Sequence, residues 1–205
     1  MRRNTKMGAQ MYHRVASMRG IVLFALLTIA ACSGGGIDGF VNNPGCESIA
    51  KRLTEEPLRE ARIGLVSGDT TRMVDVEVAD EPSSQWRGLM CRTVVPYGSG
   101  MLFEFNELAS GPFWMFNTYV PLDIIYFNRS GGVAGTAVML PCPNESGLTE
   151  SAWRVHCLEE AAEYNPGKPY TNVVELPGGW LLSEGLAINS LPEDLRLQKF
   201  VAVTR

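Results

Sequence analysis

Short apolar runs of strand length, separated by turn-forming residues, constrain this chain more than any other feature of its sequence. In residues 74–78, three valines alternate with Asp75 and Glu77, the period-two pattern of a strand with one buried face. A Ser67-Gly68-Asp69 turn precedes this run and predicts a hairpin. Further apolar runs lie at residues 63–66, 101–105, 113–115, 122–127, 133–140, 172–176 and 200–204. We therefore expect a mainly β fold with minor α content, an antiparallel sheet curled into a small barrel or sandwich with one or two short helices.

Helix signals are fewer and shorter. Thr54, followed by two glutamates and Pro57, suits the capped first turn of a short helix. Gly88, beside Trp86 and two apolar residues, suggests a second short helix packed closely on the sheet. Residues 143–169 are polar and rich in turn formers, which indicates a long surface excursion.

The N-terminus has the pattern of an export signal. Residues 1–31 carry five basic groups and no acid, and an apolar run spans residues 21–31. Eleven residues at about 1.5 Å each are too short to cross a hydrocarbon core of about 30 Å, but they suit the apolar region of a signal peptide. The run ends in IAAC, which resembles a lipobox and implies diacylation of Cys32 and cleavage before it. Met18 is a second candidate start, because it would give a signal of more usual length.

These signals divide the chain into three parts. We expect a lipoprotein signal peptide at 1–31, a Gly/Asn-rich tether at 32–45 and a single globular β-rich domain at 46–205. Two or more acyl chains give stable anchoring to a membrane. Ser33, in place of an aspartate that would retain the protein in the inner membrane, favours the periplasmic side of the outer membrane where two membranes are present.

The charge balance argues against one class of partner. After residue 31 the chain has 13 basic and 22 acidic residues, a net charge of −9. Binding to nucleic acid depends largely on lysines and arginines that neutralise phosphates. We therefore expect no nucleic-acid partner.

Three polar residues fall in or beside otherwise apolar segments. Asn117 and Asp123 lie within residues 113–127, where apolar residues on both parities indicate burial on two faces. A buried carboxylate needs a partner, and Arg87 is the nearest strong donor by sequence context, with Arg92 as an alternative. We expect Arg87, Asn117 and Asp123 to lie together, either as a structural clasp or as the lining of a binding cleft.

Several segments together resemble a known family. The strongest are VEVAD (76–80), RGLMCR (87–92), GMLFEF (100–105), FWMFNTYVPLDIIYF (113–127) and PC (141–142), with weaker matches at VVELPGG (173–179) and EGLAI (184–188). This pattern is similar to the domain-of-unknown-function family 192. The resemblance implies a β-rich domain, often exported, and no established activity. Most relatives would have a lysine where this chain has Phe116, so a hypothesis that needs a cation from that position is not met.

Four cysteines remain besides Cys32, and an even number in an exported domain favours disulfides. Counting alone leaves three pairings open. The resemblance implies a Cys142–Cys157 pair, because relatives often carry a similar pair after the Pro-Cys step. Cys46–Cys91 is then the second possible pair, with a buried free thiol at Cys91 as the alternative. A zinc site using these cysteines and His156 is the rival interpretation; since the chain has no Cys-x₂-Cys pair, we expect no metal and no cofactor.

The sequence gives enzyme activity little support. It contains no nucleophile elbow, phosphate loop, dinucleotide fingerprint or HExxH motif. We expect a non-catalytic envelope lipoprotein that binds a ligand or partner, such as a saccharide or an envelope protein, through an aromatic surface drawn from Trp86, Trp114, Tyr119 and Tyr126. The alternatives are a hydrolase or lyase acting on envelope polysaccharide through Asp123 and Glu104, or a purely structural or assembly role. The sequence does not indicate the oligomeric state.

Overall fold

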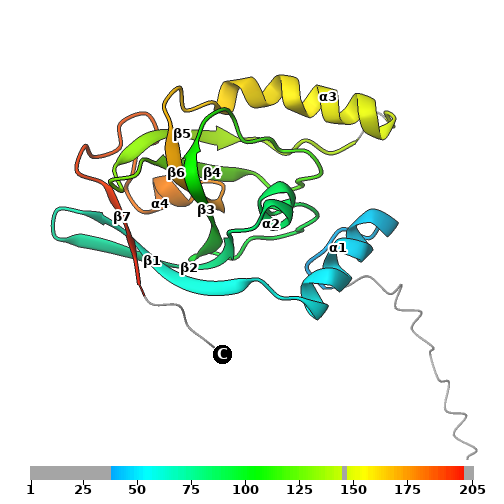
Figure 1. The fold of residues 1–205 in the computed structure, drawn as a ribbon, viewed down its shortest axis with the longest axis horizontal. Helices are drawn as coiled ribbons and strands as arrows, with labels where there is room; N and C mark the ends of the chain where they lie inside the picture. Colours follow the sequence, from blue (N-terminus) through cyan, green and yellow to red (C-terminus); the bar gives the residue numbers. More distant parts are fainter. Residues whose placement is uncertain (1–37, 145–146, 201–205) are drawn as a thin grey trace, which may run out of the picture. The chain divides into compact units, whose positions relative to one another are not determined.

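A computed structural model describes residues 38–144 and 147–200, and its centre is one seven-stranded sheet. The strands are β1 (Arg59–Ser67), β2 (Thr70–Ala79), β3 (Ser99–Ala109), β4 (Leu122–Phe127), β5 (Val133–Met139), β6 (Tyr170–Pro177) and β7 (Arg196–Lys199). Their order across the sheet is β5-β4-β6-β3-β2-β1-β7 (Figure 1). The predicted mainly β fold is confirmed, including the hairpin formed by β1 and β2.

The sheet is mixed rather than fully antiparallel. β2 and β3 pair in parallel, with Val76 opposite Gly100 and Val78 opposite Leu102. A parallel pair needs a crossover connection, and residues 80–98 supply it, with helix α2 (Pro82–Arg87) at their start. The other strand pairs are antiparallel.

The curl of the sheet stops short of a closed barrel. The turn after β4 reaches the opposite edge strand, β7, where Gly132 and Arg196 form a single bridge and Leu197 donates its amide to the Gly131 carbonyl at 3.0 Å. This single bridge does not make a ladder of strand pairs, so the architecture is an open, sandwich-like curl.

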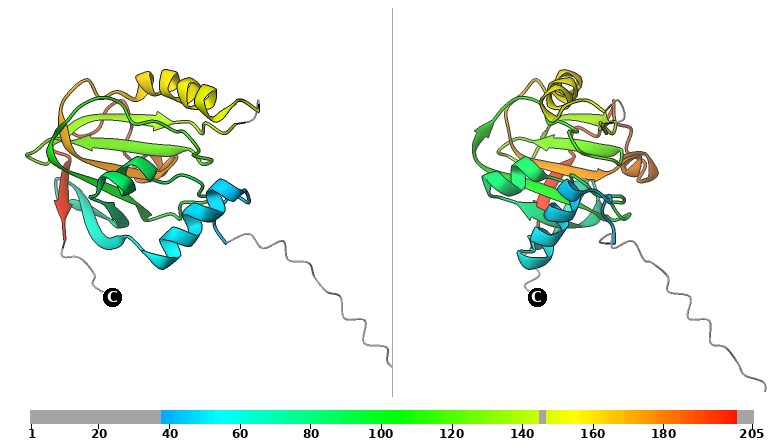
Figure 2. Two further views of the ribbon diagram at one scale, coloured as in Figure 1. Left: turned by 45° about the vertical axis from the view of Figure 1, so that its right-hand side comes forward. Right: turned by 90° about the vertical axis from the view of Figure 1, so that its right-hand side faces the viewer.

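Apolar side chains pack on both faces of the sheet. The first core lies under helices α1 (Pro44–Glu55), α2 and α3 (Glu150–Ala161), and includes Met101, Phe103, Ile124, Tyr126 and Val173. The second core lies inside the curl beside helix α4 (Trp180–Ser183), and includes Ile63, Val76, Leu102, Ile125 and Val174. Because adjacent residues of a strand point to opposite faces, β4 and β6 are buried on both sides. Figure 2 shows α1, α2 and α3 from two further directions.

The described residues contain four helices and a 3-10 turn (Ala162–Tyr164), more than the one or two helices that we predicted. The helix expected to begin at Thr54 instead begins at Pro44, with the Asn43 side chain accepting the Cys46 amide at 2.9 Å. The expected surface excursion at 143–169 contains α3. Residues 113–115 form no strand, and the described C-terminal strand is β7, since most of the run at 200–204 lies outside the described residues.

The signal peptide, Cys32 and the first six residues of the tether, 32–37, also lie outside the described residues. Among the residues that are described, no helix has both the length and the apolar character needed to span a bilayer.

Candidate functional site

An open groove of about 930 Å³ lies on the first-core side of the sheet, between α1, α2 and α3. We call it the aromatic groove because four aromatic residues line it: Trp86, Phe116, Tyr119 and Trp153. Amides and hydroxyls from Asn43, Ser48, Asn117 and Asn144 are interspersed with these rings. Apolar walls with a few placed polar groups are the usual lining of ligand sites.

Helix α3 forms one wall of the groove, and a side-chain cap and a disulfide hold it in place. The Thr149 hydroxyl caps its first turn by accepting the Ala152 amide. The Trp153 indole N–H donates to the Cys142 carbonyl at 2.9 Å. Cys157, one turn further along the helix, is bonded to Cys142. The predicted Cys142–Cys157 disulfide is therefore confirmed, and it orients Trp153 towards the groove.

A cation lies among the aromatic rings of this wall. The Arg154 guanidinium lies 4.9 Å from the Phe116 ring centre and 5.2 Å from the Trp86 ring centre. Its Nε also donates to Glu150 at 3.0 Å. Cations over aromatic faces are attracted by the ring quadrupole. Position 116 itself is a phenylalanine and carries no charge, but the Arg154 guanidinium of α3 places a positive charge directly over its ring.

The opposite wall is fixed by the second disulfide. Cys46 of α1 is bonded to Cys91, which follows α2, so the second predicted pair is also confirmed. Asn117 has a left-handed backbone (φ 56°), its carbonyl accepts the Cys91 amide at 2.8 Å, and its Nδ2 lies 3.1 Å from the Cys91 sulfur. Asparagine tolerates this backbone region better than most residues. Asn117 therefore positions the disulfide and at the same time lines the groove.

The two disulfides also bear on the zinc interpretation. Cys142, His156 and Glu160 approach one another with the spacing of metal ligands. However, the Cys142 sulfur is already bonded to Cys157, and a zinc ligand must be a free thiolate. The four cysteines are thus structural.

A small inner chamber, about 20 Å³ in volume, lies behind Trp86. Glu175 of β6 faces this chamber and is only 4% exposed. Its side-chain carboxyl group accepts no hydrogen bond from any residue that the structure describes. Burial raises the pKa of Glu175 to about 8. Gly88 borders the same chamber: its backbone at φ 50° and ψ −136° suits glycine, and an added Cβ would lie 3.3 Å from the Phe103 Cζ.

The structure does not bring the predicted trio together. Asp123 lies on the second-core face of β4, between the inward positions 122 and 124 of the first core. Its two carboxylate oxygens accept the Gly179 and Leu181 amides at 3.0 and 2.8 Å, at the start of α4. Arg87 lies on the other face, at the end of α2. The predicted contact of Arg87 with Asp123 was wrong, and only Asn117 of the three lines the aromatic groove.

Other predicted site residues have structural positions. Glu104 forms ion pairs with Arg59 and Lys199; burial alone would raise its pKa, but these two cations hold the pKa of Glu104 below its usual value. Neither Glu104 nor Asp123 lines the groove or the chamber. Tyr126 is fully buried and donates to the Tyr164 carbonyl at 2.8 Å, while Trp114 lines the inner chamber rather than the groove.

Sequence reasoning missed Trp153, Arg154 and Glu175. Trp153 and Arg154 lie in a segment that looked like a loop. Glu175 had a usable signal, since it is a carboxylate inside the apolar run 172–176 and so resembles Asp123 in its context.

The fold and the site together define a mainly β domain with two disulfides and an aromatic groove on one face of its sheet. The DUF192 family model, described as "Uncharacterized ACR", matches residues 64–190, and the chain belongs to this family. No protein with a curated description matches it.

Two crystal structures share the fold. One, from Sinorhizobium meliloti 1021 and named for a proposed role as a transcription regulator, is 25% identical, with a TM-score of 0.54 over 70% of this chain and 97% of that one. The other, from Novosphingobium aromaticivorans DSM 12444 and of unknown function, is 22% identical, with a TM-score of 0.52 over 70% and 87%.

Proposed function

We propose that this protein is an exported, lipid-anchored domain that binds a saccharide chain in the aromatic groove without catalysing its cleavage. The observation that carries the proposal is the lining of the groove, where Trp86, Phe116, Tyr119 and Trp153 alternate with amide side chains. One face of a sugar ring is rich in C–H groups and packs on aromatic rings, while its hydroxyl and acetamido groups pair with amides.

The arrangement of carboxylates supports binding rather than hydrolysis. A glycosidase needs two carboxyl groups about 5–10 Å apart across the scissile bond. Asp123 is saturated by two backbone amides and Glu104 by two cations, and both lie outside the groove. Glu150 lines the groove but is paired with Arg154.

The test uses Trp86, which is 48% exposed and forms the edge of the groove. Trp86→Ala should weaken binding of the N-acetylglucosamine tetramer by about tenfold, because aromatic contacts contribute about 0.5–1.5 kcal/mol beyond burial and the burial of the ring adds to this. Isothermal titration calorimetry with the disulfide-bonded protein measures the affinity. Tyr97→Ala removes an exposed aromatic residue outside the groove and should leave binding unchanged. Absence of binding to the wild-type protein, or equal losses in both variants, would overturn the proposal.

A further inference from the structure

A second hollow, of about 270 Å³, lies between α1 and α2 beside the aromatic groove. We call it the arginine pocket. Its lining has a repeated pattern, because each helix contributes a serine and, four residues later, an arginine: Ser48 and Arg52 from α1, Ser83 and Arg87 from α2. Residues four apart share one face of a helix, so the two serine–arginine pairs face each other across the pocket.

Among the residues that the structure describes, neither arginine of this pocket has a hydrogen-bond or ion-pair partner for its guanidinium. Arg87 is only 9% exposed, and its Nε is buried without a hydrogen bond. In residues 38–144 and 147–200, neither Arg52 nor Arg87 forms an ion pair or a hydrogen bond through its guanidinium. Five other arginines of the same region do pair with carboxylates: Arg59, Arg62, Arg72, Arg92 and Arg154. A buried charged donor without a hydrogen-bond acceptor lowers the stability of the folded state. An acceptor bound in the pocket would therefore be stabilising.

The electrostatics of the pocket also favour a bound anion. Burial lowers the pKa of Arg87, and the positive charge of Arg52 lowers it further. The nearest carboxylates only partly offset this repulsion, since Glu77 is paired with Arg92. Arginine stays protonated in proteins. A bound anion would therefore relieve both the desolvation of Arg87 and its repulsion by Arg52.

We propose that Arg52 and Arg87 bind an oxyanion, a carboxylate or a phosphate, carried by the saccharide chain whose rings lie in the aromatic groove. The two hollows adjoin, because Ser48, Ile49 and Trp86 line both. The planar guanidinium suits carboxylate and phosphate oxygens, and the serine hydroxyls add donors. The ligand class is thus an acidic saccharide. This step depends on the proposed function for the rest of the ligand, whereas the oxyanion site depends only on the pocket.

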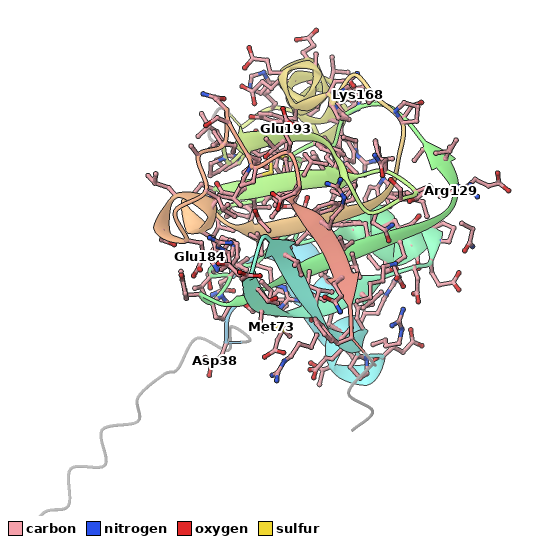
Figure 3. The ribbon with its side chains drawn as sticks, turned by 90° about the vertical axis from the view of Figure 1, so that its left-hand side faces the viewer. Asp38, Met73, Arg129, Lys168, Glu184 and Glu193 are labelled. Carbon is pink, nitrogen blue, oxygen red and sulfur yellow. A yellow bond between two sulfur atoms is a disulfide. The ribbon has the colours of Figure 1, made fainter. Side chains whose placement is uncertain are left out.

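The experiment compares two matched probes, a hyaluronan tetrasaccharide, which carries carboxylates, and the neutral N-acetylglucosamine tetramer. Wild-type protein should bind the acidic probe at least about tenfold more tightly, because a carboxylate forms charge-assisted hydrogen bonds with the two guanidinium groups that a neutral sugar cannot form. Arg87→Met and Arg52→Met should each remove most of this preference while affinity for the neutral probe changes less than about twofold. Arg52 is exposed, so its variant tests the proposal even if Arg87→Met does not fold. Arg129→Met is the control, because Arg129 is an exposed arginine on the far side of the molecule (Figure 3).

The outcomes separate the two proposals. Equal affinity of the wild-type protein for both probes, or an acidic preference that survives both arginine substitutions, overturns the acidic-saccharide site. Binding of neither probe overturns the proposed function and, with it, the saccharide part of this inference. In that case the oxyanion site is tested separately, by titrating the protein with inorganic phosphate and following the backbone amide signals by NMR. Shifts at residues 48, 52, 83 and 87 that vanish in Arg52→Met support the oxyanion site. Absence of any shift at these residues overturns it.

Discussion

Glu175 and Asp123 are two buried carboxylates on adjacent strands whose environments differ in one respect, the supply of donors. Asp123 points to the second core and accepts two backbone amides at the start of α4. Glu175 points to the first core, into a chamber lined mainly by aromatic and aliphatic groups, and the polar residues that also line it, Gln85, Arg87 and Thr118, donate no hydrogen bond to its carboxylate. An ionised carboxylate buried without donors is destabilised relative to its neutral acid, so Glu175 holds its proton at a pH where Asp and Glu side chains are normally charged.

The proton on Glu175 should make folding depend on pH. The pKa of Glu175 is raised from its usual 4.5 to about 8. Between these values the folded state binds the proton and the unfolded state does not, so stability falls as pH rises from about 4.5 to about 8, by up to about 1.4 kcal/mol per pH unit. Glu175→Gln, which is neutral at every pH, should lose this slope and be more stable than wild type at pH 8. Urea unfolding of both proteins at several pH values measures the free energy of unfolding and its dependence on pH.

Glu193→Gln is the matched control, because Glu193 lies exposed on the surface (Figure 3) and its removal should preserve the wild-type slope. A Glu175→Gln variant with the same pH dependence as wild type would show that Glu175 is ionised in the folded protein. It would then need a partner beyond those described.

At the scale of elements, most of the strands were predictable, whereas β7, the start of α1 and the whole of α3 and α4 were not. Residues 74–78 and 122–127 carry their pattern locally, as alternation or as an apolar run, and both are strands. Helix α3 lacks a clear apolar stripe: Cys157 and Ala161 face inward, while Val155 and Leu158 are exposed. Its position depends on a disulfide that joins distant residues, which local patterns do not reveal.

The same limit explains the errors in the site. The Asn43 cap that begins α1 stood inside the Gly/Asn-rich segment interpreted as a tether. Arg87 and Asp123 were joined because both are strong polar groups near apolar motifs. The alternation of side chains along the strand would have predicted the position of Asp123 better than its nearness to an apolar motif did. Asp123 lies on the same face of β4 as Ile125 and on the opposite face from Ile124. Which elements cover each face depends on the tertiary fold.

The disulfides should contribute at this scale. Cys142–Cys157 closes a 15-residue separation and Cys46–Cys91 a 45-residue separation, worth about 3 and about 4 kcal/mol in the chain-entropy account. Cys46→Ser/Cys91→Ser should therefore lower the melting temperature by several degrees and weaken binding in the groove, because α1 is no longer tied to Cys91. Differential scanning calorimetry measures the first effect, and non-reducing peptide mapping checks the pairing. Free thiols at all four positions in protein taken from the cell envelope would contradict both disulfides.

Across the whole molecule, charge and covalent structure suit an environment outside the cytoplasm. The part after residue 31 carries −9, yet the arginine pocket is locally positive. The surrounding acidic surface repels anions. Two arginines without carboxylate partners therefore attract an anion only where their combined positive potential exceeds the negative potential around them, which restricts anion binding to this pocket. The two disulfides persist in oxidising compartments. The disulfides agree with the export that the basic N-terminus and the IAAC sequence predict.

The last prediction concerns Cys32 in the full-length chain. If Cys32 bears the lipid, Cys32→Ser should release the protein from the membrane fraction and prevent incorporation of a palmitate label, because the apolar run at 21–31 alone is too short to span the bilayer. Export and anchoring can be separated in one experiment, since the Cys46–Cys91 and Cys142–Cys157 disulfides report arrival in an oxidising compartment independently of the lipid. We expect the variant to be disulfide-bonded yet unanchored, whereas Cys157→Ser should stay anchored and lose one disulfide. A Cys32→Ser protein that still carries label and sediments with membranes would refute the lipobox, and the domain would then have to be attached in another way.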